Sequence, residues 1–263
     1  MKLSELMRSA VRDEGRLSLQ VGDDWLQGRS VFGGLQAAIA LAAMRSCVAA
    51  ELPLRTLQMT FIAPIPGGTV RAAAQLLRSG KSAVHVQARL EDEDGGLLAL
   101  VIGVFGSARE SRVQRSVESV AAIPGPPPTP LPFMPGVTPN FMQHFKVELS
   151  AGALPFTNTP VTRNVFKVGL RDDGGMSESH LLALADFVPP VALSWMDGVS
   201  PGSSLTWMLE LLVDSYADQP LTGWQVDAEM VAARDGYTSQ STTISAPDGR
   251  VVALSRQTMV VFA

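Results

Sequence analysis

Residues 179–188 read Ser-His-Leu-Leu-Ala-Leu-Ala-Asp-Phe-Val, an almost wholly apolar segment with one carboxylate near its end. The segment predicts a helix that is buried on most sides. Pro189 and Pro190 are expected to end it, because proline cannot continue a helix. A carboxylate is costly to bury unless a partner satisfies it. Asp186 is therefore either a satisfied structural residue or the acid–base group of a site.

A second apolar helix is predicted in the first half of the chain. Val31-Phe32-Gly33-Gly34 leads into residues 35–44, which have almost no polar face. Such a helix must be wrapped by other elements. Gly33 and Gly34 allow another segment or a ligand to approach closely, and they leave the first amides of the helix free to donate hydrogen bonds. Tight packing alone would also explain the two glycines.

Strands lie before and after the predicted helices. Their patterns are alternating or apolar, and turns rich in glycine, proline and acidic residues separate them. The predicted strands cover residues 57–62, 69–77, 83–90 and 97–105 in the first half, and 145–149, 163–170, 204–211, 223–231, 236–244 and 251–262 in the second. One buried helix followed by a meander of antiparallel strands indicates an α+β fold.

The second half repeats the first. Arg78-Ser79-Gly80 and Arg234-Asp235-Gly236 are separated by a constant 156 positions, since 234 − 78 and 236 − 80 are both 156. Two copies of one unit predict two similar subdomains. Between them, eight of the 18 prolines fall in residues 124–139, which is typical of a semi-rigid spacer. We therefore expect an N-terminal subdomain at residues 1–110, a proline-rich linker at 111–140 and a C-terminal subdomain at 141–263.

Composition narrows the classes of function. The net charge is −4 and no basic run occurs, which argues against a nucleic-acid partner. Cys47 is the single cysteine, so no internal disulfide can form and a reducing, cytoplasmic setting is expected. The longest apolar helix candidate is about half of the roughly 20 residues that a membrane span needs. We expect no membrane span and no signal peptide.

Four features together resemble the acyl-CoA thioesterase II type, the double-hotdog thioesterases. They are Val31-Phe32-Gly33-Gly34 entering a buried helix, residues 182–186 in the second half, the strand starting at Ser204-Leu205-Thr206, and Ser255-Arg256-Gln257 in the last strand. The resemblance covers nearly the whole chain apart from the linker. It implies a double hotdog, in which each half is a long helix wrapped by an antiparallel sheet and the two sheets are joined.

The resemblance also implies an activity and its residues. The family uses an Asp, a Ser or Thr, and a Gln of the second half to hold and activate a hydrolytic water, which by position are Asp186, Ser204 and Gln257. The family often has Asp-His two residues after the hydroxyl, whereas this chain has Thr206-Trp207. That departure leaves acyl specificity open and makes Thr206 an alternative hydroxyl. The family implies a homo-oligomer, an acyl-CoA or related acyl thioester as substrate, and no cofactor.

The residues leave other readings open. Gln257 lies in an otherwise apolar strand, and its neighbour Arg256 should face the other way, so one of the two points inward. Gly33 and Gly34 would place helix amides near a thioester carbonyl, where the helix dipole favours negative charge. If Thr56 matches Ser204, the place of Asp186 in the first half falls on Ala38, which is apolar.

Three scattered histidines, His85, His144 and His180, do not predict a metal site. The absence of a Gly-x-Ser-x-Gly elbow argues against a serine hydrolase of the α/β type. The main alternative to an acyl-CoA thioesterase is a non-catalytic acyl-thioester-binding double-hotdog protein. A hotdog enoyl hydratase is a weaker alternative, because such an enzyme usually has an Asp-His pair on one short loop and we find no such pair in this sequence.

Overall fold

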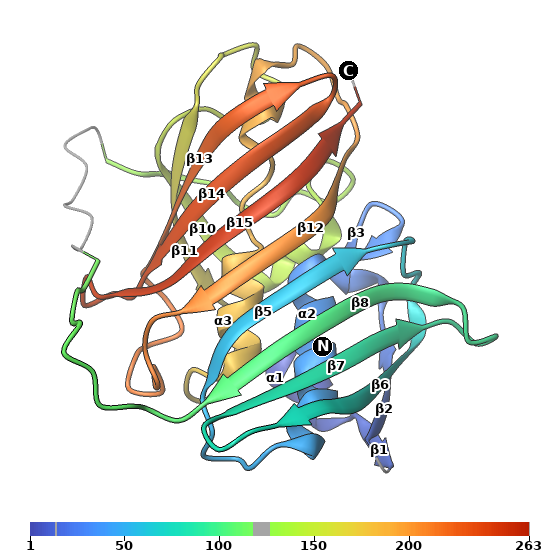
Figure 1. Ribbon diagram of the computed structural model, residues 1–263. Helices are drawn as coiled ribbons and strands as arrows, with labels where there is room; N and C mark the ends of the chain where they lie inside the picture. The colour runs from blue at the N-terminus through green and yellow to red at the C-terminus, as the bar shows by residue number, and fades with distance from the viewer. Residues whose placement is uncertain (14, 118–126, 263) are drawn as a thin grey trace.

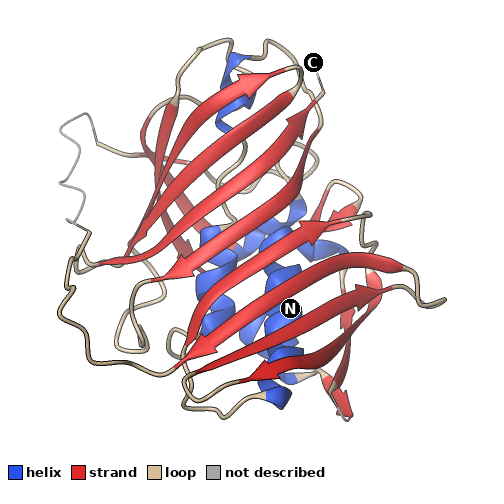
Figure 2. Ribbon diagram, viewed as in Figure 1, coloured by secondary structure: helices blue, strands red, loops and turns tan. Residues whose placement is uncertain are grey.

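The computed structural model describes residues 1–13, 15–117 and 127–262. Within these residues, thirteen strands form one continuous antiparallel sheet in the order β1-β2-β6-β7-β8-β5-β12-β15-β14-β13-β11-β10-β9. The sheet curves around the helices, which lie on its inner side (Figures 1 and 2). The predicted α+β class with a double hotdog is confirmed. No helix in the described part of the chain is both long and apolar enough to cross a membrane.

The first half contributes α1 (Leu3–Arg8), β1 (Val11–Asp13), β2 (Arg16–Val21), η1 (Asp23–Trp25), β3 (Leu26–Gln27), β4 (Ser30–Val31), α2 (Gly33–Met44), η2 (Arg45–Cys47), β5 (Leu54–Phe61), β6 (Gly68–Ser79), β7 (Ala83–Glu91) and β8 (Leu97–Gly106). The second half contributes β9 (Thr129–Pro130), η3 (Asn140–His144), β10 (Phe145–Ala151), β11 (Arg163–Leu170), α3 (Glu178–Ala185), η4 (Val191–Trp195), β12 (Gly202–Leu211), β13 (Trp224–Arg234), β14 (Tyr237–Ser245) and β15 (Val251–Val261). Part of the predicted linker, residues 118–126, lies outside the described residues.

The two halves share one topology. The sheet order β2-β6-β7-β8-β5 of the first half reappears in reverse as β12-β15-β14-β13-β11 in the second. The halves meet where β5 pairs with β12. At one end of this pairing Thr60 lies opposite Thr206, and at the other end Thr56 lies opposite Glu210, so that Thr56 corresponds to Thr206 and Thr60 to Glu210. Both comparisons give an offset of 150, since 206 − 56 and 210 − 60 are equal. An approximate twofold axis therefore passes between β5 and β12 and relates these five strands of one half to the five of the other.

The helices α2 and α3 pack against each other beneath this junction. Every residue of α2 except Ala42 is buried, as expected for a helix without a polar face. Gly34 allows the close approach, because a Cβ atom added there would lie 2.9 Å from the Cα atom of Ala183 in α3. The helix–helix contact thus brings the beginning of α2 close to the end of α3.

The helix α3 is shorter than predicted. It ends at Ala185, and Asp186 is its C-cap residue with φ −97° and ψ 1°. The N–H of Phe187 donates to the carbonyl of Leu184 in a tighter turn, and the proline pair that follows has no N–H to extend the helix. The carboxylate of Asp186 therefore lies at the end of the helix, beyond its last regular turn.

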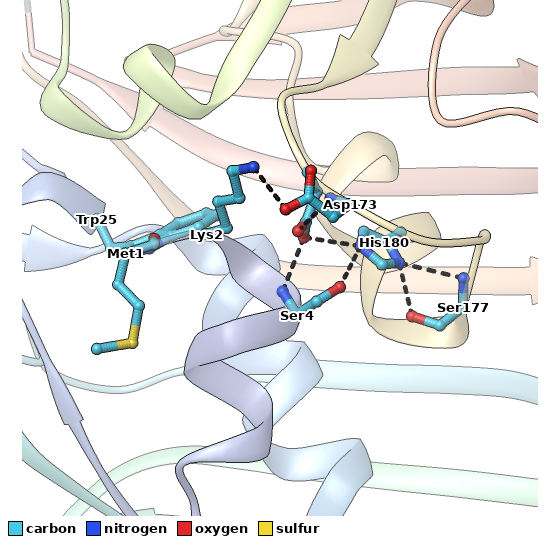
Figure 3. Close-up of polar contacts among 8 residues, drawn as sticks. Met1, Lys2, Ser4, Trp25, Asp173, Ser177 and His180 are labelled. Carbon is cyan, nitrogen blue, oxygen red and sulfur yellow. Dashed lines mark hydrogen bonds and ion pairs between the residues drawn. The ribbon is translucent and has the colours of Figure 1, made fainter.

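A buried polar cluster holds the beginning of α3 against the N-terminal helix α1 (Figure 3). The backbone N–H and hydroxyl of Ser177 both contact His180 Nδ1, at 3.2 and 2.7 Å, so this nitrogen accepts and Nε2 donates to Asp172 at 2.9 Å. The backbone N–H of Ser4 donates to the same carboxylate at 2.7 Å. Burial opposes ionisation of Asp172, but the hydrogen bonds from Ser4 and His180 outweigh it and lower its pKa. The cluster joins the two halves and fixes α3.

Candidate active site

Asp186 is the centre of the candidate site. It is partly buried, and its Oδ1 atom accepts a hydrogen bond of 2.5 Å from Nε2 of Gln257 on β15. Its other oxygen faces the beginning of α2, because a Cβ atom added at Gly33 would lie 2.5 Å from Oδ2. The same added atom would lie 3.1 Å from the ring of Phe61, at the end of β5. Three elements from both halves therefore surround one carboxylate.

The electrostatics of this carboxylate are unusual. Burial raises the pKa of Asp186 to about 7, while the hydrogen bond from Gln257 and the backbone N–H of Gly34 pull it partly back. No charged side chain of the described residues contributes to the shift. A carboxylate with a pKa near neutrality can both take up and release a proton under ordinary conditions, which is the property that general acid–base catalysis requires.

Gln257 points into the molecule, as the sequence pattern favoured. It is 6% exposed, whereas its neighbour Arg256 lies on the outer face and donates to the hydroxyl of Ser239 at 3.1 Å. Because successive side chains of a strand alternate between faces, Arg256 outward requires Gln257 inward. The distance to Asp186 shows that the predicted acid and the predicted amide lie together.

The two candidate hydroxyls lie on opposite faces of β12. A bulge between Ser204 and Thr206 interrupts the alternation, so that Ser204 pairs with the buried Met259 and Thr206 pairs with Thr258. Thr206 is exposed and also lies opposite Thr60, on the outer face. Ser204 is partly buried and shares the inner face with Gln257. The structure therefore brings Ser204 to the side of the sheet that holds Asp186, and it does not bring Thr206 there.

Gly33 and Gly34 form the first turn of α2 directly beside Asp186. No larger residue fits at either position, since an added Cβ atom at Gly34 would lie 2.7 Å from the ring of Phe32. The backbone N–H of Gly34 faces the carboxylate and lowers its pKa. Sequence reasoning placed these amides at a thioester carbonyl, and it missed their proximity to Asp186 and to Phe61. The pairing of an aromatic strand end with a Gly-Gly helix start is the signal that could have indicated it.

The equivalent place in the first half is apolar. Through the twofold relation, Gly103 on β8 opposite Leu57 corresponds to Gln257 on β15 opposite Trp207. A Cβ atom added at Gly103 would lie 2.7 Å from the sulfur of Met44, the last residue of α2. Met44 therefore fills the place that Asp186 occupies in the second half. The Ala38 assignment from the sequence is wrong by six residues.

Among the residues that the structure describes, no three His, Cys, Asp or Glu side chains are grouped so that they would hold a metal ion.

The fold defines a structural class. A helix wrapped by an antiparallel sheet, present twice and joined edge to edge, is the double hotdog. Among solved structures, a hot dog fold protein of unknown function from Alicyclobacillus acidocaldarius is similar, with 21% identity, a TM-score of 0.86 and coverage of 98% of this chain and 97% of that one.

Two further solved structures share this architecture. The tesB protein of Mycobacterium avium subs paratuberculosis has 15% identity, a TM-score of 0.75 and full coverage of both chains. The acyl-CoA thioesterase II TesB2 of Mycobacterium marinum has 17% identity, a TM-score of 0.71 and coverage of 98% of this chain and 96% of that one. No curated protein matches the chain significantly.

Family models identify the two halves separately. The model of the acyl-CoA thioesterase N-terminal domain matches residues 21–106, and the model of the acyl-CoA thioesterase C-terminal domain matches residues 118–261. The chain therefore belongs to the acyl-CoA thioesterase family.

Proposed function

We propose that this protein hydrolyses acyl-CoA, or a related acyl thioester, by means of a water molecule that Asp186 activates. The observation that carries the proposal is the Asp186–Gln257 pair, with a hydrogen bond of 2.5 Å and a carboxyl pKa of about 7. A purely structural carboxylate gains nothing from a raised pKa, because burying its charge costs stability. Perturbed carboxylates of this kind are concentrated at functional sites.

Hydrolysis proceeds in two steps. Asp186 takes a proton from water while the water oxygen bonds to the thioester carbonyl carbon, and the carbonyl oxygen becomes an oxyanion. The carbon–sulfur bond then breaks as the intermediate collapses, and the protonated Asp186 returns the proton to the leaving thiolate. The products are a carboxylic acid and a thiol, with no other reactant.

The other residues orient these partners. The amide of Gln257 holds Asp186 from the sheet, and Ser204 supplies a hydroxyl for the water on the same inner face. The N–H of Gly34 stays on the Asp186 carboxylate, and the N–H of Gly33 donates to the developing oxyanion, which the positive end of the α2 dipole favours. Base and oxyanion site are thus supplied by opposite halves of the chain.

A thiol-release assay over a panel of acyl-CoA chain lengths tests the proposal. Asp186→Asn is expected to lower kcat by about 10²- to 10⁴-fold, the usual contribution of a general base. The parent's kcat should fall about tenfold per pH unit below pH 7, because the base must be ionised. The matched control is Asp235→Asn at the exposed β13–β14 turn, which should keep parental kinetics.

Two outcomes would contradict the proposal. Parental kcat in Asp186→Asn would remove this carboxylate from the mechanism. A parent protein that binds acyl-CoA by calorimetry yet releases no thiol at any chain length would be a non-catalytic acyl-thioester-binding protein.

A further inference from the structure

A second buried glutamine lies beside the site. Gln240 on β14 pairs directly with Gln257 on β15, and both side chains face the inner side of the sheet. Gln240 is only 2% exposed. Gln240 is not one of the residues that hold or activate the water in the mechanism above.

Gln240 forms a hydrogen bond with the segment that follows Asp186. Its Oε1 atom accepts a hydrogen bond of 2.9 Å from the backbone N–H of Val191. Val191 carries the first N–H after Pro189 and Pro190, which have none to offer. The hydrogen bonds of Asp186 and Phe187 back to α3 are both long, at 3.3 Å. Phe187 packs against the rings of Phe145 and Phe166, and the bond from Gln240 ties the far end of residues 186–191 to the sheet.

The first half lacks this arrangement. Val86 on β7 pairs with Gly103 as Gln240 on β14 pairs with Gln257, so Val86 is the counterpart of Gln240. Val86 is completely buried among apolar groups. The hotdog fold therefore does not need a glutamine at this position, because the first half has valine there. Two neighbouring buried amides occur in the half whose helix ends in a carboxylate, which links Gln240 to the site rather than to the fold.

We propose that Gln240 is a positioning residue for the hydrolytic site. By holding Val191 it keeps residues 186–191 against the inner face, where the carboxylate of Asp186 stays within hydrogen-bonding distance of Gln257. Gln240 acts through Asp186 and touches no reacting atom. The inference rests on the proposed function and adds a residue to it.

The variant that tests the proposal is Gln240→Met, which has similar length and no amide oxygen. A displacement of about 1 Å in a catalytic group can cost 10²-fold in rate, so kcat should fall by about 10- to 100-fold while KM changes little. Since the hydrogen bond from Gln257 lowers the pKa of Asp186, loosening it should move the acid limb of the pH profile above pH 7.

Thr242→Val is the matched control, because Thr242 lies two residues along β14 and is also buried. All assays are run well below the melting temperature of each variant, so that only folded protein is compared. Thr242→Val should alter the melting temperature without moving the acid limb. Parental kcat and acid limb in Gln240→Met, or equal changes in both variants, would overturn the proposal.

A second readout separates this inference from the proposed function. A carboxyl ¹³C titration of Asp186 follows its pKa without any turnover. A raised pKa in Gln240→Met and an unchanged one in Thr242→Val would support positioning even if the parent hydrolysed no acyl-CoA tested. Identical titrations in the parent and Gln240→Met would refute it.

Discussion

The two halves of this molecule have the same frame but opposite contents where a helix ends beneath its sheet. In the second half, Asp186 at the end of α3 meets Gln257. In the first half, Met44 at the end of α2 lies against Gly103, with its sulfur 2.7 Å from the place of a Cβ atom. One place holds a carboxylate and an amide, and the other a thioether and a bare backbone. The hotdog fold therefore needs no polar group at the end of its helix.

The crossing of the two helices also differs at its two ends. The beginning of α2 is a pair of glycines, of which Gly33 lies directly against Asp186 and Phe61. The beginning of α3 is Glu178, whose carboxylate forms a bidentate ion pair with Arg45 after α2. One end of the helix pair thus adjoins the carboxylate of Asp186, and the other end is closed by an ion pair.

The largest effect is expected when the hydroxyls of β12 are removed one at a time. Ser204→Ala should lower kcat by about 100-fold or more, the usual loss for one positioned polar group in an active site. Thr206→Val should stay within about twofold, because Thr206 is exposed on the outer face. Steady-state thiol release measures both. A larger loss in Thr206→Val than in Ser204→Ala would show that the hydroxyl works from the other face.

A second test concerns stability against pH. The pKa of Asp186 is about 7 in the folded protein against 3.8 for an ordinary aspartate, so the folded state binds the proton more tightly than the unfolded state between these values. The parent therefore loses stability as pH rises through this window, and Asp186→Asn does not. Above pH 7 the variant should be more stable by roughly 2–4 kcal/mol.

Urea unfolding of parent and variant from pH 4 to pH 8 measures this difference. Asp235→Asn, with its exposed carboxylate, should follow the parent throughout. Parallel curves for the parent and Asp186→Asn would mean that the folded carboxyl titrates like a free one.

The smallest effect is expected in the first half. Gly103→Val should lower the free energy of unfolding by about 1–3 kcal/mol, because its side chain overlaps Met44. Met44→Ala in the same chain should recover part of that loss, since it opens the space. Thermal melting of the single and double variants measures the coupling. Additive losses would show that the two positions do not share one space.

The sequence carried most of the fold. Two apolar helices and two strand meanders predicted an α+β fold, the glycine turns after Arg78 and Arg234 revealed the duplication, and the family resemblance implied the double hotdog. These features could be predicted because hydrophobic periodicity and turn residues are local properties of the sequence. The inward direction of the Gln257 side chain could be predicted for the same reason, because successive side chains alternate between the two faces of a strand.

The finer geometry was not readable. The choice between Ser204 and Thr206 depends on a bulge in β12, which the sequence does not signal. The equivalence of Met44 with Asp186 depends on α2 having 12 residues and α3 eight. The bond from Gln240 to Val191 joins residues 49 positions apart across the core. Each of these is set by tertiary packing and not by a local pattern.

The joining of the halves through β5 and β12 has a consequence for biosynthesis. The last strand of the first half ends at Gly106, and β12 begins at Gly202, so 95 residues must emerge between them. At ribosomal rates of roughly 5–20 residues per second, the edge of β5 waits about 5–20 s for its partner. During that delay the edge offers unpaired N–H and C=O groups to any neighbouring nascent chain. Two first halves on one polysome present the same edge to each other, so crowded translation should favour their mispairing until β12 arrives.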